Sequence, residues 1–197
     1  MDKSERTREH ILERAAGVFN QQGFSGASMA DIMAATGLQK GGIYWHFGSK
    51  EQLALEAFDY AVNQANAELA RLLEGRTDAL DRLVAVIDAF REHLANPRLP
   101  GGCAVMNTAL ESDDGNPALR EKARSAMDDL LRTVEALLVE GQRRGEVRAD
   151  ADVRQAATVV VGSAEGALAI SRLLDDPGYM DTTAEHLRWY IDTRLRP

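Results

Sequence analysis

Apolar residues recur every three or four positions along most of the chain, as they do on the buried face of an α-helix. Over residues 4–22 the apolar positions run from Ile11 to Phe19, and Gly23 follows where a left-handed residue commonly caps a helix. The C-terminal part shows the same helical spacing without a convincing alternating strand. The pattern therefore predicts an all-α protein of about nine helices, with an N-terminal helix-turn-helix head and a C-terminal helical body.

One stretch near the N-terminus predicts two short helices joined by a tight turn. Ser28 and Asp31 have the spacing of a capping box, Gly37 ends the first short helix, and the second runs over about 39–46. Two short helices joined by a glycine-containing turn form a helix-turn-helix, whose second helix can enter the major groove of DNA. The apolar residues of the stretch suit a small helical core: Met29, Ile32, Met33, Leu38, Ile43 and Phe47.

Six further helices are expected after this stretch, and capping residues, glycines and prolines mark their ends. They are expected over 49–74, 77–95, 103–112, 117–144, 152–174 and from 181 onward. The helix over 152–174 is the richest in apolar and small residues. Because a helix that is apolar all round is a buried one, we expect other helices to cover it on nearly all sides.

Charge is unevenly placed along the chain. The 197 residues carry a net charge of −8, yet residues 1–50 hold six basic and five acidic side chains. An acidic protein can still bind DNA when its few cations lie on the docking face. Since no run of about 18 apolar residues is present and the N-terminus is charged from its second residue, we expect a cytoplasmic protein without a membrane span.

Few residues could support other chemistry. Cys103 is the single cysteine, which excludes an internal disulfide, and the four histidines are scattered without the spacing of a zinc site. The sequence shows no nucleophile–base arrangement and no glycine-rich phosphate loop. We therefore expect no enzyme activity, no cofactor and no bound metal.

The residues of the helix-turn-helix also form a family pattern. Its elements are Gly23-Phe24, Ala30-Asp31-Ile32, Gly37, Lys40-Gly41, Tyr44, Phe47 and Ser49-Lys50. Residues from about 6 to 53, a quarter of the chain, strongly resemble the TetR family, the tetracycline-repressor-like transcriptional regulators of bacteria. Gln39, Gly42 and Trp45 depart from the residues commoner in the family at positions that touch or neighbour DNA, so they bear on the operator sequence. The resemblance implies a DNA-binding domain over 1–48 and a ligand-binding and dimerisation domain over 49–197.

The expected DNA contacts follow from the chemistry of the second short helix. Gly41 and Gly42 allow close approach to the phosphates, although each costs about 1 kcal/mol of helix stability relative to alanine. Gln39 can hydrogen-bond adenine, and Lys40 can reach guanine or a phosphate. Trp45 is either a contact at the groove edge or a packing residue. With phosphate contacts from other side chains and helix starts, the predicted set is Ser28, Gln39, Lys40, Gly41, Gly42, Tyr44, Trp45, His46 and Lys50.

A homodimer is expected, because a single helix-turn-helix buries too little surface to be specific and such proteins bind palindromic DNA as two-fold dimers. The last two helices are the expected dimer surface, since small residues let helices pack closely and aromatic residues supply apolar area. The residues expected there are Gly162, Gly166, Ala167, Trp189, Tyr190 and Leu195. The alternative is that the helix over 152–174 is the central core helix of a monomer.

The resemblance also implies a pocket among the middle helices for a small-molecule effector, whose binding moves the helix beginning at Ser49 and shifts the population away from DNA binding. The residues expected to line it, each of which could instead be simple core, are Phe58, Val62, Phe90, Cys103, Met106, Leu110, Met127, Leu131 and Glu165. Cys103 stands at a predicted helix start, where amide dipoles favour a thiolate. It is therefore either a sensor of oxidants and electrophiles or a small buried hydrophobe.

Together these features predict a sequence-specific DNA-binding transcriptional regulator, namely a repressor released from its operator by a small molecule or a reactive electrophile. A transcriptional activator is the alternative within this class of protein. An all-helical small-molecule-binding protein or enzyme without a role on DNA is the alternative outside it.

Overall fold

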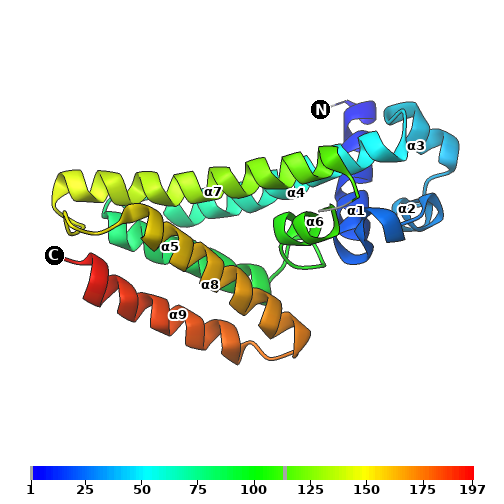
Figure 1. Cartoon of the computed structure of the whole chain (residues 1–197). Coiled ribbons are helices and arrows are strands. Elements are labelled where there is room, and N and C mark those ends of the chain that lie inside the picture. The colour runs from blue at the N-terminus through cyan, green and yellow to red at the C-terminus, as the bar shows by residue number, and fades with distance from the viewer. Residues whose placement is uncertain (1, 113–114) are drawn as a thin grey trace. The chain divides into compact units, whose positions relative to one another are not determined.

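The computed structural model describes residues 2–112 and 115–197, and this part of the chain is all-helical (Figure 1). The helices are α1 (Lys3–Gly26), α2 (Met29–Thr36), α3 (Lys40–His46), α4 (Lys50–Leu73), α5 (Ala79–Ala95), α6 (Ala104–Ser112), α7 (Pro117–Arg144), α8 (Val153–Leu173) and α9 (Gly178–Tyr190). A π-helical turn over Ile191–Leu195 continues α9. The predicted all-α fold of about nine helices is confirmed for the described residues.

Packing divides the chain into two compact units. The head unit comprises Met1–Ala65 and Arg98–Ala126 in its described part, and the body unit comprises Asn66–Pro97 and Met127–Pro197. The predicted functional boundary between residues 48 and 49 does not coincide with this division and stays a prediction. Helices α2 and α3 therefore belong to the same compact unit as α6 and the first part of α7, which come much later in the sequence.

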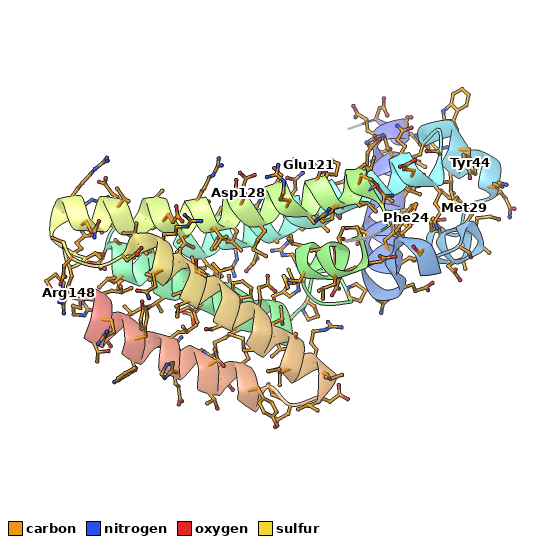
Figure 2. The ribbon with its side chains drawn as sticks, in the orientation of Figure 1. Phe24, Met29, Tyr44, Glu121, Asp128 and Arg148 are labelled. Carbon is orange, nitrogen blue, oxygen red and sulfur yellow. The ribbon has the colours of Figure 1, made fainter. Side chains whose placement is uncertain are left out.

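The core of the head unit joins α1, α2 and α3 to the first turns of α4. Ile32, Ile43 and Phe47, three of the predicted core residues, are at most 1% exposed. The other three predicted core residues are partly buried and pack against this cluster: Met29, Met33 and Leu38. Figure 2 labels Met29 among them. Leu99, from the loop before α6, is also buried in it. All six residues predicted to form the core of the helix-turn-helix are thus buried or packed against the head core.

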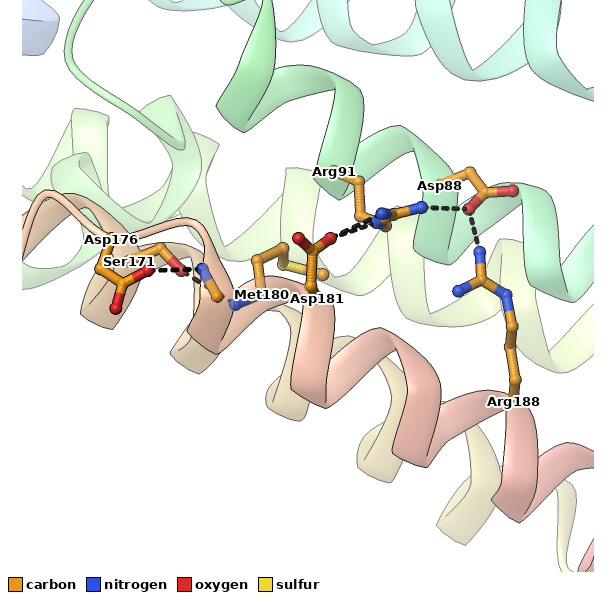
Figure 3. A network of polar contacts seen from close by, with 8 residues as sticks. Asp88, Arg91, Ser171, Asp176, Met180, Asp181 and Arg188 are labelled. Atoms are coloured by element: carbon orange, nitrogen blue, oxygen red, sulfur yellow. Dashed lines mark hydrogen bonds and ion pairs between the residues drawn. The ribbon is translucent and has the colours of Figure 1, made fainter.

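The core of the body unit is built from α5, α8 and α9 with the last part of α7. Ion pairs add to its apolar contacts between α5 and α9 (Figure 3). Arg91 Nε donates to Asp181 Oδ1 over 3.0 Å, and Arg188 donates to Asp88. Because these side chains are partly exposed, the pairs contribute little to stability beyond orienting the two helices.

Helix α8 is covered less completely than its composition predicts. Among the described residues it is the one helix long and apolar enough to cross a membrane by length and composition, yet half of its most apolar window is buried within the protein. The other side is exposed, with Val159 at 36%, Ile170 at 44% and Leu173 at 80%. Within a single chain α8 is therefore covered on one side, and its coverage on nearly all sides stays a prediction.

Candidate nucleic-acid interface

Two capping motifs fix the geometry of α2 and the turn after it. Ser28 and Asp31 form the predicted capping box, in which the Ser28 N–H donates to Asp31 Oδ2 over 2.8 Å and the Asp31 N–H donates to Ser28 Oγ over 3.2 Å. The hydrogen bonds from Ser28 lower the pKa of the Asp31 carboxyl. At the other end Gly37 takes the left-handed conformation (φ 69°) that reverses the chain, and its N–H donates to the Met33 carbonyl. The turn into α3 is thereby set by local chemistry.

Helix α3 presents the outward side chains that a groove-reading helix needs. Ile43 is buried in the head unit, while Gln39, Lys40 and Trp45 are exposed. Trp45 is 84% exposed, which excludes its alternative as a packing residue within the chain. Lys40 Nζ lies 5.6 Å from the centroid of the Tyr44 ring and therefore lies beside one of the predicted phosphate contacts.

The two glycines of α3 are not required by packing within the chain. A Cβ atom at Gly41 would have no described side chain within 4 Å, and one at Gly42 would meet only the Leu38 Cβ at 4.0 Å. Glycine in a helix interior costs about 1 kcal/mol relative to alanine. Packing within the described chain therefore gives no reason for glycine at these two positions, and their predicted role in close approach to DNA stays a prediction.

Two of the predicted phosphate contacts already have partners inside the head unit. The Lys50 ammonium donates to the Phe24 carbonyl and lies 4.4 Å from the centroid of the Phe24 ring. The Ser28 hydroxyl donates to Asp31 Oδ2 over 2.6 Å. Phosphate contacts from these two side chains stay predictions and would require the side chains to reorient. Tyr44 and His46, the other two predicted phosphate contacts, are half-buried and so keep part of their surface accessible.

Family models match both parts of the chain. A model described as bacterial regulatory proteins of the tetR family matches residues 11–57, which include the whole helix-turn-helix. A second model, described as the tetracyclin repressor-like C-terminal domain, matches residues 79–187, more than half of the chain. The chain belongs to the TetR family. It is a helix-turn-helix DNA-binding transcriptional regulator, and the family is one of regulators rather than enzymes.

Similar proteins match this TetR-family chain over about three quarters of its length or all of it. A crystal structure of a TetR transcriptional regulator from Chloroflexus aurantiacus is 43% identical, covers 100% of this chain and 99% of its own, and has a TM-score of 0.95. The transcriptional regulator TtgR of Pseudomonas putida is 27% identical over 98% of this chain and 92% of its own. The transcriptional repressor ComR of Escherichia coli is 30% identical over 74% of this chain and 70% of its own.

The residues predicted for a dimer surface differ in exposure. Gly162, Gly166 and Trp189 are exposed, and Tyr190 is partly buried against the core of the body unit. Ala167 and Leu195 are only 5% and 2% exposed, because both lie in the core of the body unit. These two are therefore core residues of this TetR-family chain, not members of an exposed face. The same part of the chain, from α8 to the start of α9, also has exposed apolar residues that the sequence analysis did not select: Val159, Ile170, Leu173, Leu174 and Tyr179.

The residues predicted for an effector pocket fall in both units of the TetR-family chain. Phe58, Val62, Cys103, Met106 and Leu110 belong to the head unit, and Phe90, Met127, Leu131 and Glu165 belong to the body unit. Phe58 and Leu110 line one cavity, although Leu110 is 76% exposed. Three of the body-unit residues pack against the body core, which agrees with the alternative that they are simple core residues: Phe90, Met127 and Leu131. Glu165 is 7% exposed on α8, and Cys103 is half-buried directly before α6.

Three polar residues of the head unit were missed by the sequence analysis. Asn20, Asn107 and Glu111 join α6 to the end of α1 through hydrogen bonds between residues 86 or 87 positions apart. No local pattern signals such pairs, because asparagine and glutamate at exposed helix positions usually face water. Only the folded chain brings them together.

Proposed function

We propose that this regulator is a cytoplasmic repressor that binds a palindromic operator as a homodimer and leaves it when a small molecule binds. The observation that carries the proposal is α3 itself, a short exposed helix with two glycines that packing within the described chain does not require. The name of ComR, a transcriptional repressor, supports repression over activation. The residues proposed to contact DNA are the exposed members of the set predicted from the sequence, with Trp45 at the groove edge: Ser28, Gln39, Lys40, Gly41, Gly42 and Trp45.

The dimer is supported by exposed apolar and small residues on α8 and α9. On α8 the exposed apolar and small residues recur at helical spacing, from Val159 through Gly162 and Gly166 to Ile170. On α9 Trp189 is 56% exposed and its ring lies 5.2 Å from the His186 ring. Two such helices from each protomer form a four-helix interface, in which the glycines allow close approach.

Binding to DNA from the chain's own upstream region tests the proposal. The full-length protein is expected to retard this DNA in a gel and to raise its fluorescence anisotropy, with strong weakening as salt rises. Unrelated DNA of the same length serves as the control. A folded protein that binds neither DNA at low salt would contradict the proposal.

Replacing Lys40 by Gln tests whether α3 provides cationic contacts. We expect weaker operator binding, and a slope of log affinity against log salt that is smaller by about 1 for each phosphate that is no longer neutralised. The matched control is Arg143→Gln, which removes one positive charge from an exposed position of the body unit. Equal slopes for the two variants would show that Lys40 does not bind a phosphate.

A further inference from the structure

A cavity of about 560 Å³ lies within the head unit, bordered by α1, α4, α6 and the start of α7. Its apolar lining includes the rings of Phe19 and Phe58 together with Leu119 and several alanines of α4. Its polar lining consists of Asn20, Gln21, Gln22, Asn107, Thr108 and Glu111. A volume of this size, an apolar wall and a few convergent polar groups are the usual attributes of a small-molecule site.

Glu111 connects the wall of this cavity to the end of α1. The chain kinks at Gly23 (φ 75°, ψ 167°), so the amides that follow are displaced from regular helical bonding. The Glu111 carboxylate accepts both of the next N–H groups, from Phe24 over 2.8 Å and from Ser25 over 2.7 Å. Hydrogen bonds to a charged acceptor are about twice as strong as neutral ones. This contact therefore holds α6 against the end of α1, directly before the chain turns into α2.

A second contact between α6 and α1 lies on the same cavity wall. Asn107 Nδ2 donates to Asn20 Oδ1 over 2.9 Å and to the Gly101 carbonyl over 2.7 Å. Asn20 Nδ2 in turn donates to the carbonyls of Pro100 and Gly102, each over 2.8 Å. Since Asn20, Asn107 and Glu111 all line the cavity, a molecule inside it touches the polar groups that join α6 to α1.

The formal charge of the cavity lining indicates the charge of the ligand that would bind there. Among the described lining residues Glu111 is the one with a formal charge, and the other polar groups are amides and a hydroxyl. A carboxylate at the edge of an apolar site attracts a cation and repels an anion. Three phenylalanine side chains contribute to the apolar lining, namely Phe19, Phe24 and Phe58, of which Phe58 is only 7% exposed. Their rings suit an aromatic or aliphatic group.

We propose that this cavity is an effector site for small amphipathic cations, molecules with an apolar body and an ammonium group that pairs with Glu111. An ammonium bound there competes with the Phe24 and Ser25 amides for the carboxylate and loosens the contact between α6 and α1. A ligand that binds the loosened state better shifts the population towards it. The effect on operator binding rests on the proposed function, whereas the site itself does not.

A set of three matched probes tests the site without DNA. The probes are 4-phenylbutylamine, 4-phenylbutanol and 4-phenylbutyrate, which share one apolar body and carry a positive, neutral or negative head at pH 7. Calorimetric titration of the full-length protein is expected to give an affinity for the amine at least about tenfold higher than for the carboxylate, because a hydrogen bond to a charged group is worth about 1.5–3 kcal/mol. If none of the probes binds at millimolar concentration, or if the carboxylate binds as well as the amine, the proposal is wrong.

Two variants locate the bound probe. Thr108→Trp places a large ring at the half-buried cavity wall and is expected to weaken amine binding at least about tenfold, whereas Thr133→Trp, exposed on α7 outside the cavity, leaves it unchanged. Glu111→Gln is expected to bring the amine and the alcohol within about threefold of each other, whereas Glu121→Gln preserves the preference. Thermal melting checks that each variant is folded. Unchanged amine binding in Thr108→Trp, or a preserved preference in Glu111→Gln, would overturn the assignment.

Operator binding then separates the site from the proposed function. The amine is expected to lower operator affinity for the parent protein and not for Thr108→Trp. Binding of the amine at the site in a protein that never binds its upstream DNA would leave the site intact and contradict the proposed function. Normal operator binding without the expected calorimetric pattern would contradict the proposed site and leave the proposed function intact.

Discussion

Replacing Gly41 by Leu is expected to weaken operator binding strongly while leaving the free protein at least as stable as the parent. A Cβ atom at this position would have no described side chain within 4 Å, so the leucine enters open space. Replacing glycine by a good helix former in α3 stabilises the helix by up to about 1 kcal/mol. In the proposed complex, however, the leucine side chain of each protomer would collide with the DNA of its half-site. Because each well-made base contact is worth about 1–3 kcal/mol, we expect operator affinity to fall at least about 100-fold.

Two measurements made together distinguish this outcome from simple misfolding. Thermal melting gives the stability of the free protein, and fluorescence anisotropy gives its affinity for the operator. The matched control is Ala118→Leu, which adds the same side chain at an exposed position of α7. Operator binding within about threefold of the parent in Gly41→Leu would show that α3 does not approach DNA closely at this position.

Replacing Gly166 by Arg is expected to convert the protein into a folded monomer. The position is exposed, and no described side chain lies within 4 Å of a Cβ atom there, so the core of the body unit is untouched. In the proposed four-helix interface the same arginine separates the helices and buries a charge without a partner, which costs several kcal/mol. A monomer contacts only one half-site, so operator affinity should fall by a factor of about 10² or more.

Light scattering on the full-length protein measures the expected change from dimer to monomer, and thermal melting confirms that the variant folds. Ala118→Arg is the control, because it adds the same charge to an exposed helix position outside α8 and α9. A Gly166→Arg protein that remains dimeric would place the interface elsewhere. Its operator affinity would then be expected to stay close to that of the parent.

The features that the sequence predicted well are those fixed by local chemistry. Ser28, Asp31 and Gly37 fix the ends of α2 through contacts within a few residues, and these contacts are observed. Helix positions likewise follow from a hydrophobic period that any one helix carries by itself. The family pattern in residues 11–57 is of the same kind, because it depends on spacing within one short stretch.

The features that the sequence did not predict depend on contacts between distant segments. The hydrogen bond from the Lys50 ammonium to the carbonyl of Phe24, 26 positions earlier, was not predicted, whereas the phosphate contact expected of Lys50 stays a prediction. On α8 the composition was apolar on most sides, so periodicity could not tell Ala167, which is buried, from Gly166, which is exposed. Only the positions of α5 and α9 decide which side of α8 is covered.

The composition of the head unit limits how the protein could be recombined with others. Chimeric regulators are often imagined as a DNA-reading segment joined to a foreign sensing segment, and the obvious place to cut this chain is after residue 48. Such a graft would leave behind Leu99, which is buried in the head core, and Glu111, which holds the corner after α1. The transplanted helices would then expose apolar surface and unpaired amides. A successful exchange of operator preference is therefore better sought by replacing outward side chains of α3 within the intact chain.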